Sequence, residues 1–344
     1  MKSKFLQNTI SISLSLILTL FLTFIILLII GKNPFEIFYI IYEEVLMSGY
    51  GFGQALFKAT PLIFCGIGLS FCFNASIFNI GAEGQLNAGT FIIALLLYYL
   101  SPLPTIINII ISISVGFIVS AFFGFIPAII KIKKGVSEVI TTIMLNFIIL
   151  ALINYFLINY FAVRETVRTE KIPEFLMLPK FSDYFSFFEG SALNFSFILA
   201  IILSVVSYFI IYKTKFGYKI RAIGLNETAS KYMGIKVNIV TLITFLIGAG
   251  ITSLVGLNYV VGYKGYFEFG FSNNLGFTAI AVTLLAKNNP IGIIFSSIMF
   301  GILDFGGLAI NTIVPKEIML VIQGIVILSI ISIDKLVNIY FEKK

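Results

Sequence analysis

Residues 213–238, KTKFGYKIRAIGLNETASKYMGIKVN, form a polar stretch between two apolar segments. Asn226 is suited to cap the start of a helix here, because its side-chain oxygen can accept a hydrogen bond from a free N–H of the first turn. Glu227 follows in that turn, where a negative charge suits the helix dipole, and Lys231 lies four residues later, within reach of an ion pair. Gly234 can adopt the left-handed conformation that often ends a helix. The pattern predicts a short helix between Asn226 and Gly234.

Such a short helix needs another surface to pack against. About seven residues do not hold a helix together in water, because nucleation costs more free energy than two turns return. Two hypotheses stay open: the segment docks on a partner at the cytoplasmic face of a membrane protein, or it folds back as a loop on its own protein.

The composition places the chain among polytopic membrane proteins. Hydrophobic residues make up 59% and charged residues 11%, with a mean hydropathy of +1.05, whereas soluble domains carry about 25% charged residues. The net charge of +7 comes from basic residues that are spread along the chain, and lysine outnumbers arginine. Because arginine is the usual residue for bidentate contacts to bases and phosphates, no nucleic-acid partner is predicted.

The residue inventory argues against an enzyme. Histidine is absent, which removes the commonest general base and the commonest metal ligand. Cys65 and Cys72 share one apolar segment and would stand about 10 Å apart along a helix, too far for a disulfide. No G-x-x-x-x-G-K-[ST] phosphate loop occurs, so any ATP-driven step requires a separate subunit. No cofactor and no metal site are predicted.

Ten apolar segments predict about ten transmembrane helices in an all-α fold. They cover residues 8–31, 60–73, 86–100, 105–130, 139–161, 194–212, 239–260, 276–286, 291–310 and 318–333. The first is longer than a signal-peptide core and lacks an A-x-A cleavage site, which indicates an uncleaved span. With the N-terminus inside, the inner segments hold 15 of the 23 lysines and arginines. The positive-inside rule then favours cytoplasmic termini, a cytoplasmic loop at 213–238 and an external loop at 162–193.

Short segments suggest broken spans and an internal repeat. Segments 60–73 and 276–286 are too short to cross about 30 Å unaided, and 86–100 suffices only if its glycine-rich lead-in is helical. Segments of this kind often line the pathway of a transporter. Two halves of five spans would have opposite topology, with a long polar loop, 32–58 or 213–238, after the first span of each. This spacing favours an inverted repeat.

Polar side chains gather where the third span begins. Asn79 can cap the helix that follows, Glu83 lies in its first turn, and Gln85 comes two residues later. A carboxylate in a membrane is costly unless it is paired, so Glu83 is a candidate for function. The alternative is a helix cap whose acid extends to the interface.

A second polar group lies before and within the short segment 276–286. Asn273 and Asn274 precede it and Thr278 lies on it, while Asn146 lies within the fifth span. Uncharged amides and hydroxyls inside a bundle suit a polar, uncharged solute. Hydrogen bonds that only hold helices together are the alternative for all of them. Asp304 is the acid in the middle of a span, where it could carry a proton or cation, or be a hydrogen-bonded structural group.

Four ordered runs resemble the sugar/nucleoside branch of the ABC importer permeases. They are FNIGAEGQLNAG (78–89), GVSEVITTIMLN (135–146), RAIGLNETASKYMGI (221–235) and GFTAIAVTLLAKNNPIG (276–292). Together they extend over most of the chain. Ser230, where a second alanine is common, and Ala286, where glycine is common, are the departures from the family pattern.

The resemblance implies a permease with a vitamin B12-importer-like helix arrangement in the cytoplasmic (inner) membrane. It implies two permease chains, identical or paralogous, on two ATPase subunits, fed by an external substrate-binding lipoprotein and working by alternating access. A nucleoside is the solute it favours, with simple sugars as the alternative; an ion-coupled secondary transporter that uses Asp304 is the alternative from another class. The residues it assigns to ATPase coupling are Gly217, Arg221, Gly224, Asn226, Glu227, Lys231 and Gly234.

Overall fold

The computed structural model describes the backbone of residues 2–342 and arranges the chain in two compact units. The description leaves out the side chains of residues 2–12, 16, 316, 317, 327, 330, 331, 334, 338 and 340–342. The expected cytoplasmic ends, 1–7 and 334–344, therefore fall largely on residues whose side chains are not described. Unit 1 comprises Met1–Lys58 and Met299–Lys344, and unit 2 comprises Ala59–Ile298. The units are described separately.

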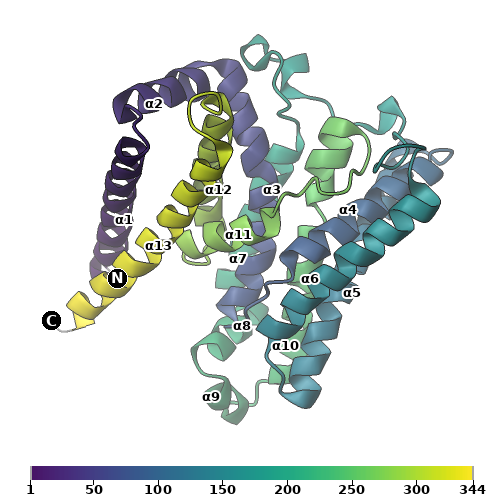
Figure 1. The fold of residues 1–344 in the computed structure, drawn as a ribbon. Helices are drawn as coiled ribbons and strands as arrows, with labels where there is room; N and C mark the ends of the chain where they lie inside the picture. The colour runs from purple at the N-terminus through teal and green to yellow at the C-terminus, as the bar shows by residue number, and fades with distance from the viewer. Residues whose placement is uncertain (1, 343–344) are drawn as a thin grey trace. The chain divides into compact units, whose positions relative to one another are not determined.

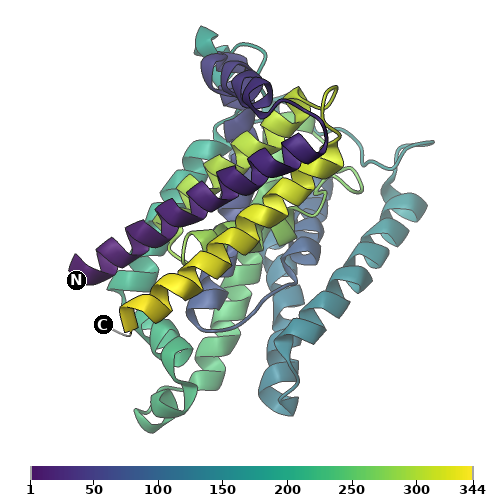
Figure 2. The ribbon, with the colours of Figure 1, turned by 60° about the vertical axis from the view of Figure 1, so that its left-hand side comes forward.

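Unit 1 is built on two long helices that lie side by side in opposite directions (Figures 1 and 2). Its elements are α1 (Lys2–Ile29), α2 (Pro34–Ile41), the π-helix η1 (Tyr42–Met47), α13 (Lys316–Glu342) and the adjoining parts of α3 (Gly49–Asn74) and α12 (Pro290–Ala309). The chain turns by 120° between the segments Ser13–Ile29 and Pro34–Met47, where Asn33 accepts a hydrogen bond from the N–H of Phe35 at 3.1 Å. A buried apolar cluster closes the unit around Leu27, Ile37, Ile310, Val314, Met319 and Ile322.

The first polar loop expected from the sequence is largely helical. Residues 32–58 contain α2, η1 and the first turns of α3, so the expectation of a long loop there was wrong. Segment 60–73 is likewise not a short span, because α3 has 26 residues. Lys58 contributes to the polar character from which a loop was predicted for residues 32–58. Its side chain pairs with Asp304 at 3.1 Å within unit 1, and the two charges neutralise each other.

Unit 2 is a helical bundle. It contains α4 (Ala82–Tyr99), α5 (Thr105–Lys134), α6 (Glu138–Phe156) with the π-helix η2 (Leu157–Phe161), α7 (Ser196–Lys213), α8 (Lys215–Leu225), α9 (Glu227–Tyr232), α10 (Val237–Thr252) with the π-helix η6 (Leu257–Lys264), and α11 (Leu275–Leu285). The helix α5 packs extensively along both α4 and α10. The glycine-rich lead-in to segment 86–100 is helical from Ala82, so α4 has 18 residues. The helix α11 has 11 residues and is short, as the sequence predicts.

Small residues allow the three central helices to approach closely. A Cβ atom added to Gly89 would lie 2.2 Å from the Cβ of Ser253, and one added to Gly116 would lie 2.4 Å from Ile93. The hydroxyl of Ser120 lies between α4 and α10, within hydrogen-bond distance of the carbonyls of Gln85 and Ala249, at 2.6 and 2.8 Å. Small residues and hydroxyls at such crossings are typical of helices that pack in a membrane, where water supplies no hydrophobic drive.

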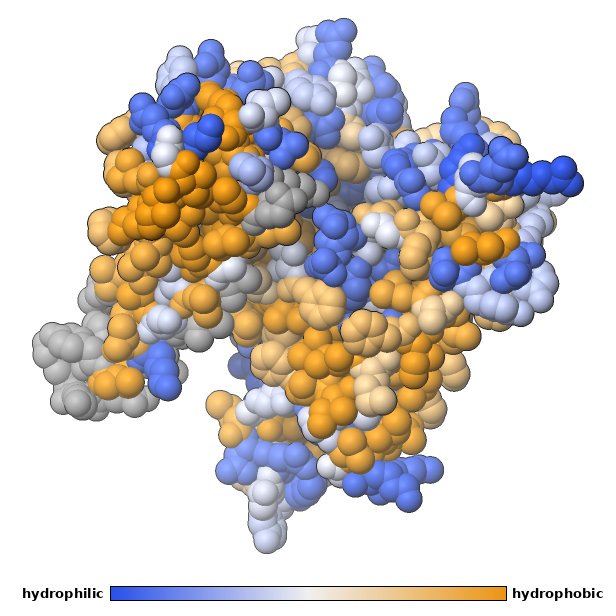
Figure 3. All heavy atoms as spheres, in the orientation of Figure 1, coloured by the Kyte–Doolittle hydropathy of each residue, from blue (hydrophilic) through white to orange (hydrophobic). Residues whose placement is uncertain are grey.

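Six helices in the described residues are long and apolar enough to cross a membrane. They are Gly49–Asn74, Thr105–Lys134, Glu138–Phe161, Ser196–Lys213, Val237–Lys264 and Pro290–Ala309; the bent pair Ser13–Ile29 and Pro34–Met47 would make a seventh. Each of the ten segments expected from the sequence largely coincides with a helix; segments 139–161 and 239–260 each begin in an α-helix and end in a π-helix. On the surface of unit 2, apolar residues occupy the middle of the bundle and polar residues gather at its two ends (Figure 3). Cys65 and Cys72 are buried and free, as expected.

The segment 162–193 is an ordered part of unit 2. It contains three 3-10 turns, Glu174–Leu176, Phe181–Asp183 and Ser186–Phe188. Its backbone pairs with the stretch after α10 through Thr169 N–H to Phe267 O at 2.9 Å and Ile172 N–H to Gly265 O at 2.7 Å. These two backbone hydrogen bonds hold segment 162–193 against residues 265–267, so the segment can keep one conformation.

Gly89→Ala is expected to destabilise the protein by about 1–3 kcal/mol, because the added methyl has no space against Ser253. The matched control is Gly324→Ala, since a Cβ at Gly324 meets nothing within 4 Å. Thermal unfolding of the purified chain in detergent measures both. Equal midpoints for the two variants would contradict the close packing of α4 against α10.

Candidate functional site

The loop that joins α3 to α4 is held by one face of α6. The carboxylate of Glu138 accepts a hydrogen bond from the N–H of Phe78 at 3.3 Å. It also forms an ion pair with Lys131 at 2.6 Å. One turn later, the hydroxyl of Thr142 accepts from the N–H of Ile80 at 3.2 Å. Residues four apart lie on one helix face, so α6 presents a row of acceptors to the loop.

Asn146, a further turn along α6, completes this row. Its amide nitrogen donates to the carbonyl of Ile80 at 2.8 Å, and its amide oxygen accepts from the N–H of Gly84 at 2.9 Å. Its side chain is 3% exposed. Both ends of the amide are therefore engaged with backbone, and Asn146 positions the start of α4 rather than facing an open pathway.

Asn79 and Gln85 bind each other. The Asn79 amide donates to the Gln85 oxygen at 2.9 Å, and both side chains are buried. The expected cap of α4 by Asn79 was wrong, because the helix starts at Ala82 with Gly81 as its N-cap. Asn79 Oδ1 instead accepts from the N–H of Gly81 at 3.0 Å, which tightens the turn before the helix.

Glu83 joins the first turns of two helices. Its side chain is 5% exposed. One carboxylate oxygen accepts from the hydroxyl of Ser272 and, at 3.4 Å, from the amide of Asn87; the other accepts from the N–H of Gly276 at 2.7 Å. The hypothesis of an acid that extends to the interface was wrong. Glu83 caps α11 from outside, which places a negative charge at the positive end of that helix.

Backbone contact reinforces this junction. A Cβ atom added to Gly276 would lie 2.4 Å from the backbone nitrogen of Glu83. The amide of Asn87, one turn along α4, donates to Ser272 at 2.9 Å and to the carbonyl of Glu83 at 2.7 Å. All polar groups of the junction therefore have partners within the protein.

The remaining candidates lie outside this buried network. Asn273 and Asn274 are exposed and have φ angles of 43° and 65°, in the left-handed region that asparagine tolerates. Thr278 is half-buried, and its hydroxyl lies 3.4 Å from the carbonyl of Asn274. These side chains at the start of α11 can offer uncharged hydrogen-bonding groups to a solute. The seven candidates thus divide into Asn79, Glu83, Gln85 and Asn146, which hold the structure, and Asn273, Asn274 and Thr278, which remain accessible.

The short helix between Asn226 and Gly234 forms as the sequence predicts. The side chain of Asn226 accepts from the N–H of Ala229 at 2.9 Å, and Lys231 pairs with Glu227 at 2.6 Å. The helix α9 ends before Gly234, whose φ is +78°. Asn226 also ends α8, so one residue joins the two helices.

Gly217 and Arg221 fix α8 against α7. A Cβ at Gly217 would lie 2.2 Å from the carbonyl oxygen of Ile210, so the helices meet backbone to backbone. The guanidinium of Arg221 lies 5.3 Å from the centre of the Tyr212 ring, a favourable cation–π arrangement.

Gly224 places the other end of α8 on the end of α3. A Cβ at Gly224 would lie 2.2 Å from the carbonyl oxygen of Asn74. The hydroxyl of Ser76 donates to the carbonyl of Gly224 at 2.7 Å. The helix α8 therefore contacts the same loop that leads to Glu83.

Large apolar side chains lie just before α9, at its last position and just after it, and all three are exposed. Leu225 is 88% exposed, Tyr232 89% and Met233 60%. Within α9 itself, Ser230 is the buried residue. A six-residue helix with so little support from its own chain has a free face for a partner.

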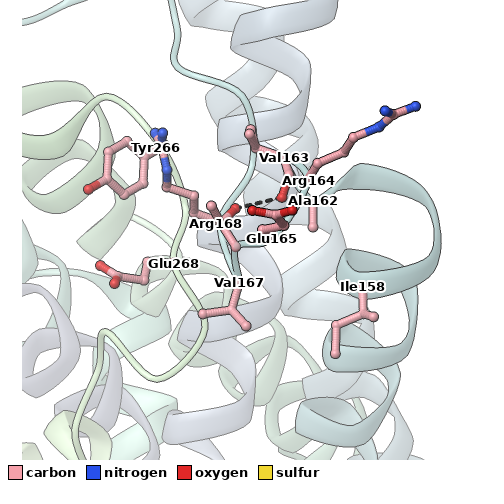
Figure 4. A pocket seen from close by; sticks show the side chains of 10 residues that line it. Ile158, Ala162, Val163, Arg164, Glu165, Val167, Arg168, Tyr266 and Glu268 are labelled. Atoms are coloured by element: carbon pink, nitrogen blue, oxygen red, sulfur yellow. Dashed lines mark hydrogen bonds between the residues drawn. The ribbon is translucent and has the colours of Figure 1, made fainter.

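A hollow of about 790 Å³ opens on segment 162–193 of unit 2 (Figure 4). Its walls are the turn between Ala162 and Arg168, with Tyr266, Glu268 and Ile158. Arg168 stacks on the ring of Tyr266 at 4.6 Å, and Arg164 extends away from the other side chains in Figure 4. In the described residues no group of three or more His, Cys, Asp or Glu could hold a metal ion.

The sequence did not indicate Ser272, Asn87 or Thr142 as site residues. Asn87 lies one helical turn after Glu83, so its position on the same face could have been read from spacing. The contact of Ser272 with Glu83 joins residues 189 positions apart. No local pattern signals such a contact.

The chain belongs to the permease family described as the branched-chain amino acid transport system / permease component, whose model matches residues 51–331. It is a multi-pass membrane protein of this family. It is 32% identical over 311 residues to the nucleoside ABC transporter permease protein NupB of Lactococcus lactis, covering 88% of this chain and 85% of that protein. The guanosine ABC transporter permease protein NupP of Bacillus subtilis is 30% identical over 316 residues, covering 90% and 88%. The glucose ABC transporter permease protein TsgB13 of Haloferax volcanii is 27% identical over 314 residues, covering 89% and 82%. No solved structure matches significantly.

Asn146→Ala is expected to destabilise the protein, by about 1–3 kcal/mol for each backbone group that loses its partner. The N–H of Gly84 and the carbonyl of Ile80 are those groups. Asn159→Ala is the matched control, because Asn159 is exposed on the same helical segment and bonds only the carbonyl of Tyr155. Thermal unfolding in detergent compares them. If Asn159→Ala is the more destabilising, α6 does not hold the loop as described.

Proposed function

We propose that this chain is the membrane permease subunit of an ATP-driven importer and that its solute is a nucleoside. The observation that carries the first part is α9, a capped six-residue helix whose flanking Leu225, Tyr232 and Met233 are exposed. Such a helix needs a partner surface. A cleft in an ATPase subunit provides one, and it also supplies the ATP-hydrolysing machinery for which this sequence has no phosphate loop.

The proposed topology has ten spans in two inverted halves of five, with both termini in the cytoplasm. The inward excess of lysine and arginine supports this orientation. It places segment 213–238 on the ATPase side and the ordered segment 162–193 outside. The short helix α11 is then a broken span whose N-terminus lies within the bundle, as in transporters that bind solute near the membrane midplane.

The nucleoside assignment rests on the relatives and on the chemistry at α11. NupB and NupP are named as nucleoside and guanosine permeases. Asn273, Asn274 and Thr278 offer amide and hydroxyl groups, which match the uncharged polar edges of a base and a ribose. Glu83 already neutralises the N-terminus of α11, so that helix end does not call for an anion. A sugar is the second candidate, because TsgB13 is named as a glucose permease.

The proposed assembly has two permease chains, identical or paralogous, with two ATPase subunits inside and a substrate-binding lipoprotein outside. ATP binding closes the ATPase pair and moves residues 217–236. This motion opens the pathway to the outside, where the lipoprotein delivers solute over the segment 162–193. Hydrolysis resets the inward-facing state.

An ion-coupled transporter is disfavoured by the pairing of Asp304. The Lys58 ammonium lies 3.1 Å from its carboxylate, so the acid already has a cationic partner within the protein. The ion-coupled alternative also provides no partner for the exposed apolar side chains at α9.

Replacing Leu225, Tyr232 and Met233 together by serine is expected to abolish both co-purification of the ATPase and nucleoside uptake. Because these side chains are exposed, their loss removes partner contacts and costs the fold little. The control is Tyr184→Ser with Phe187→Ser, two exposed aromatic residues of segment 162–193. The control should keep the ATPase; a serine triple variant that also keeps it would contradict the docking role of α9.

Asp304→Asn is expected to leave ATP-driven uptake mostly unchanged. Uptake is measured in proteoliposomes that contain ATP and have no ion gradient, with the permease, its ATPase and its binding protein present. Lys58→Met with Asp304→Asn is the companion variant, which removes the charge that the single change leaves unpaired. Uptake that needs a proton or sodium gradient, and that both variants lose, would favour the ion-coupled alternative.

A further inference from the structure

We infer that the short helix α11 and the segment from Asn74 to Glu83 move as one rigid body during transport, with Glu83 as the positioning residue that joins them. This inference rests on the proposed transport function and names how the motion of the cytoplasmic segment reaches the polar side chains of α11. All the residues involved belong to unit 2.

The N-terminal end of α11 is fixed by Glu83. Its carboxylate accepts from the backbone N–H of Gly276 and from the hydroxyl of Ser272, in a site that excludes water. Breaking these bonds within the bundle would leave a carboxylate and a helix N-terminus unpaired, which costs much more than breaking exposed bonds. The junction is therefore expected to stay closed while the bundle moves.

The C-terminal end of α11 lies against α3. The hydroxyl of Thr283, in the last turn of α11, lies 3.3 Å from the carbonyl of Gly66 and 2.7 Å from the carbonyl of Ala279 in its own helix, and a Cβ atom added to Gly66 would lie 3.2 Å from this hydroxyl. The amide of Asn74, at the end of α3, donates to the carbonyl of Asn288 at 2.9 Å, just after α11. The helix is thus bound at both ends by residues on either side of one ten-residue segment.

The cytoplasmic helices contact this same segment. Gly224 of α8 packs on the carbonyl of Asn74 and accepts a hydrogen bond from Ser76 at 2.7 Å. A displacement of α8 and α9 therefore pushes on the end of α3 and the loop, and through Glu83 on the start of α11. Asn273 and Asn274 lie at that start, so the solute-facing groups follow the coupling helix.

The test is a cross-link across the junction. Asn87→Cys and Ser272→Cys are introduced into a chain whose Cys65 and Cys72 are alanine, because the two native side-chain atoms lie 2.9 Å apart. The pair is closed with an oxidant or a short bis-thiosulfonate reagent, with and without ATP, in complexes whose ATPase does not hydrolyse. The expected result is equal cross-linking in both states, and nucleoside uptake by the cross-linked, hydrolysing complex that equals the uptake of the same double-cysteine complex kept reduced.

Two outcomes would overturn the inference. One is loss of uptake on cross-linking that a reducing agent restores, since the junction would then have to open. The other is no cross-link in either state, since the contact itself would be absent. Single-cysteine variants control for the reagent. If the uncross-linked parent takes up neither nucleosides nor sugars, the proposed function fails, while the cross-link in the two states still reports on the junction.

Variants of Glu83 test its positioning role separately. Glu83→Ala is expected to lower the amount of nucleoside taken up per ATP hydrolysed by about tenfold, because α11 no longer follows the loop. Glu83→Gln keeps a side-chain oxygen that can accept from the N–H of Gly276, and its amide nitrogen can hydrogen-bond to the hydroxyl of Ser272. This variant should therefore retain most of the nucleoside uptake per ATP hydrolysed. Merely structural damage would lower the yield of assembled complex and leave the ratio unchanged, so an unchanged ratio in Glu83→Ala would contradict the role.

Discussion

The structure depends on satisfying backbone groups where helices break inside an apolar bundle. A free N–H or carbonyl costs several kcal/mol where no water can reach it. Two breaks lie close together in unit 2, at the loop before α4 and at the start of α11. Side chains of α6 serve the first break, and the carboxylate of Glu83 serves the second. The polar residues of the run at 78–89 are thus mostly committed to holding the chain in a shape that a continuous helix would not need.

The sequence predicted features that arise within a few residues of chain. The cap at Asn226, the pair of Glu227 with Lys231 and the left-handed Gly234 all follow from local spacing, and all are present. The apolar segments likewise locate the helices. Failures came where distant residues decide: Lys58 looked like part of a polar loop because its partner, Asp304, is far along the chain. The partners of Glu83 and Asn146 are also non-local, so spacing along the sequence did not indicate that both side chains are buried and hydrogen-bonded; their place in the substrate pathway stays a prediction.

Two part-exposed ion pairs illustrate how charge is tolerated in so apolar a chain. Lys58 with Asp304 in unit 1 and Lys131 with Glu138 in unit 2 each join two helices. A lone charge in such surroundings would mark an ion pathway. Paired charges instead fix helices in register, and breaking one partner is more costly than replacing both. The basic excess of the chain therefore resides in its loops and ends, where it orients the protein in the membrane.

The division of the polar residues bears on how a transporter can be both rigid and mobile. A solute site needs side chains whose hydrogen bonds are free, and these are the least constrained groups of a bundle. Here Asn273 and Asn274 are exposed and Thr278 is half-buried, but the helix that follows the two asparagines and carries Thr278 is bound at its start by Glu83 and just after its end by Asn74. The hydroxyl of Ser296 in α12 also donates to the carbonyl of Val282 in α11, at 2.9 Å. Because the bonds to Glu83 and Asn74 lead to the two ends of one short segment, α11 is expected to follow that segment. Motion that begins at Gly224 reaches it through the same short segment, so solute-facing groups and coupling helix are expected to change position together.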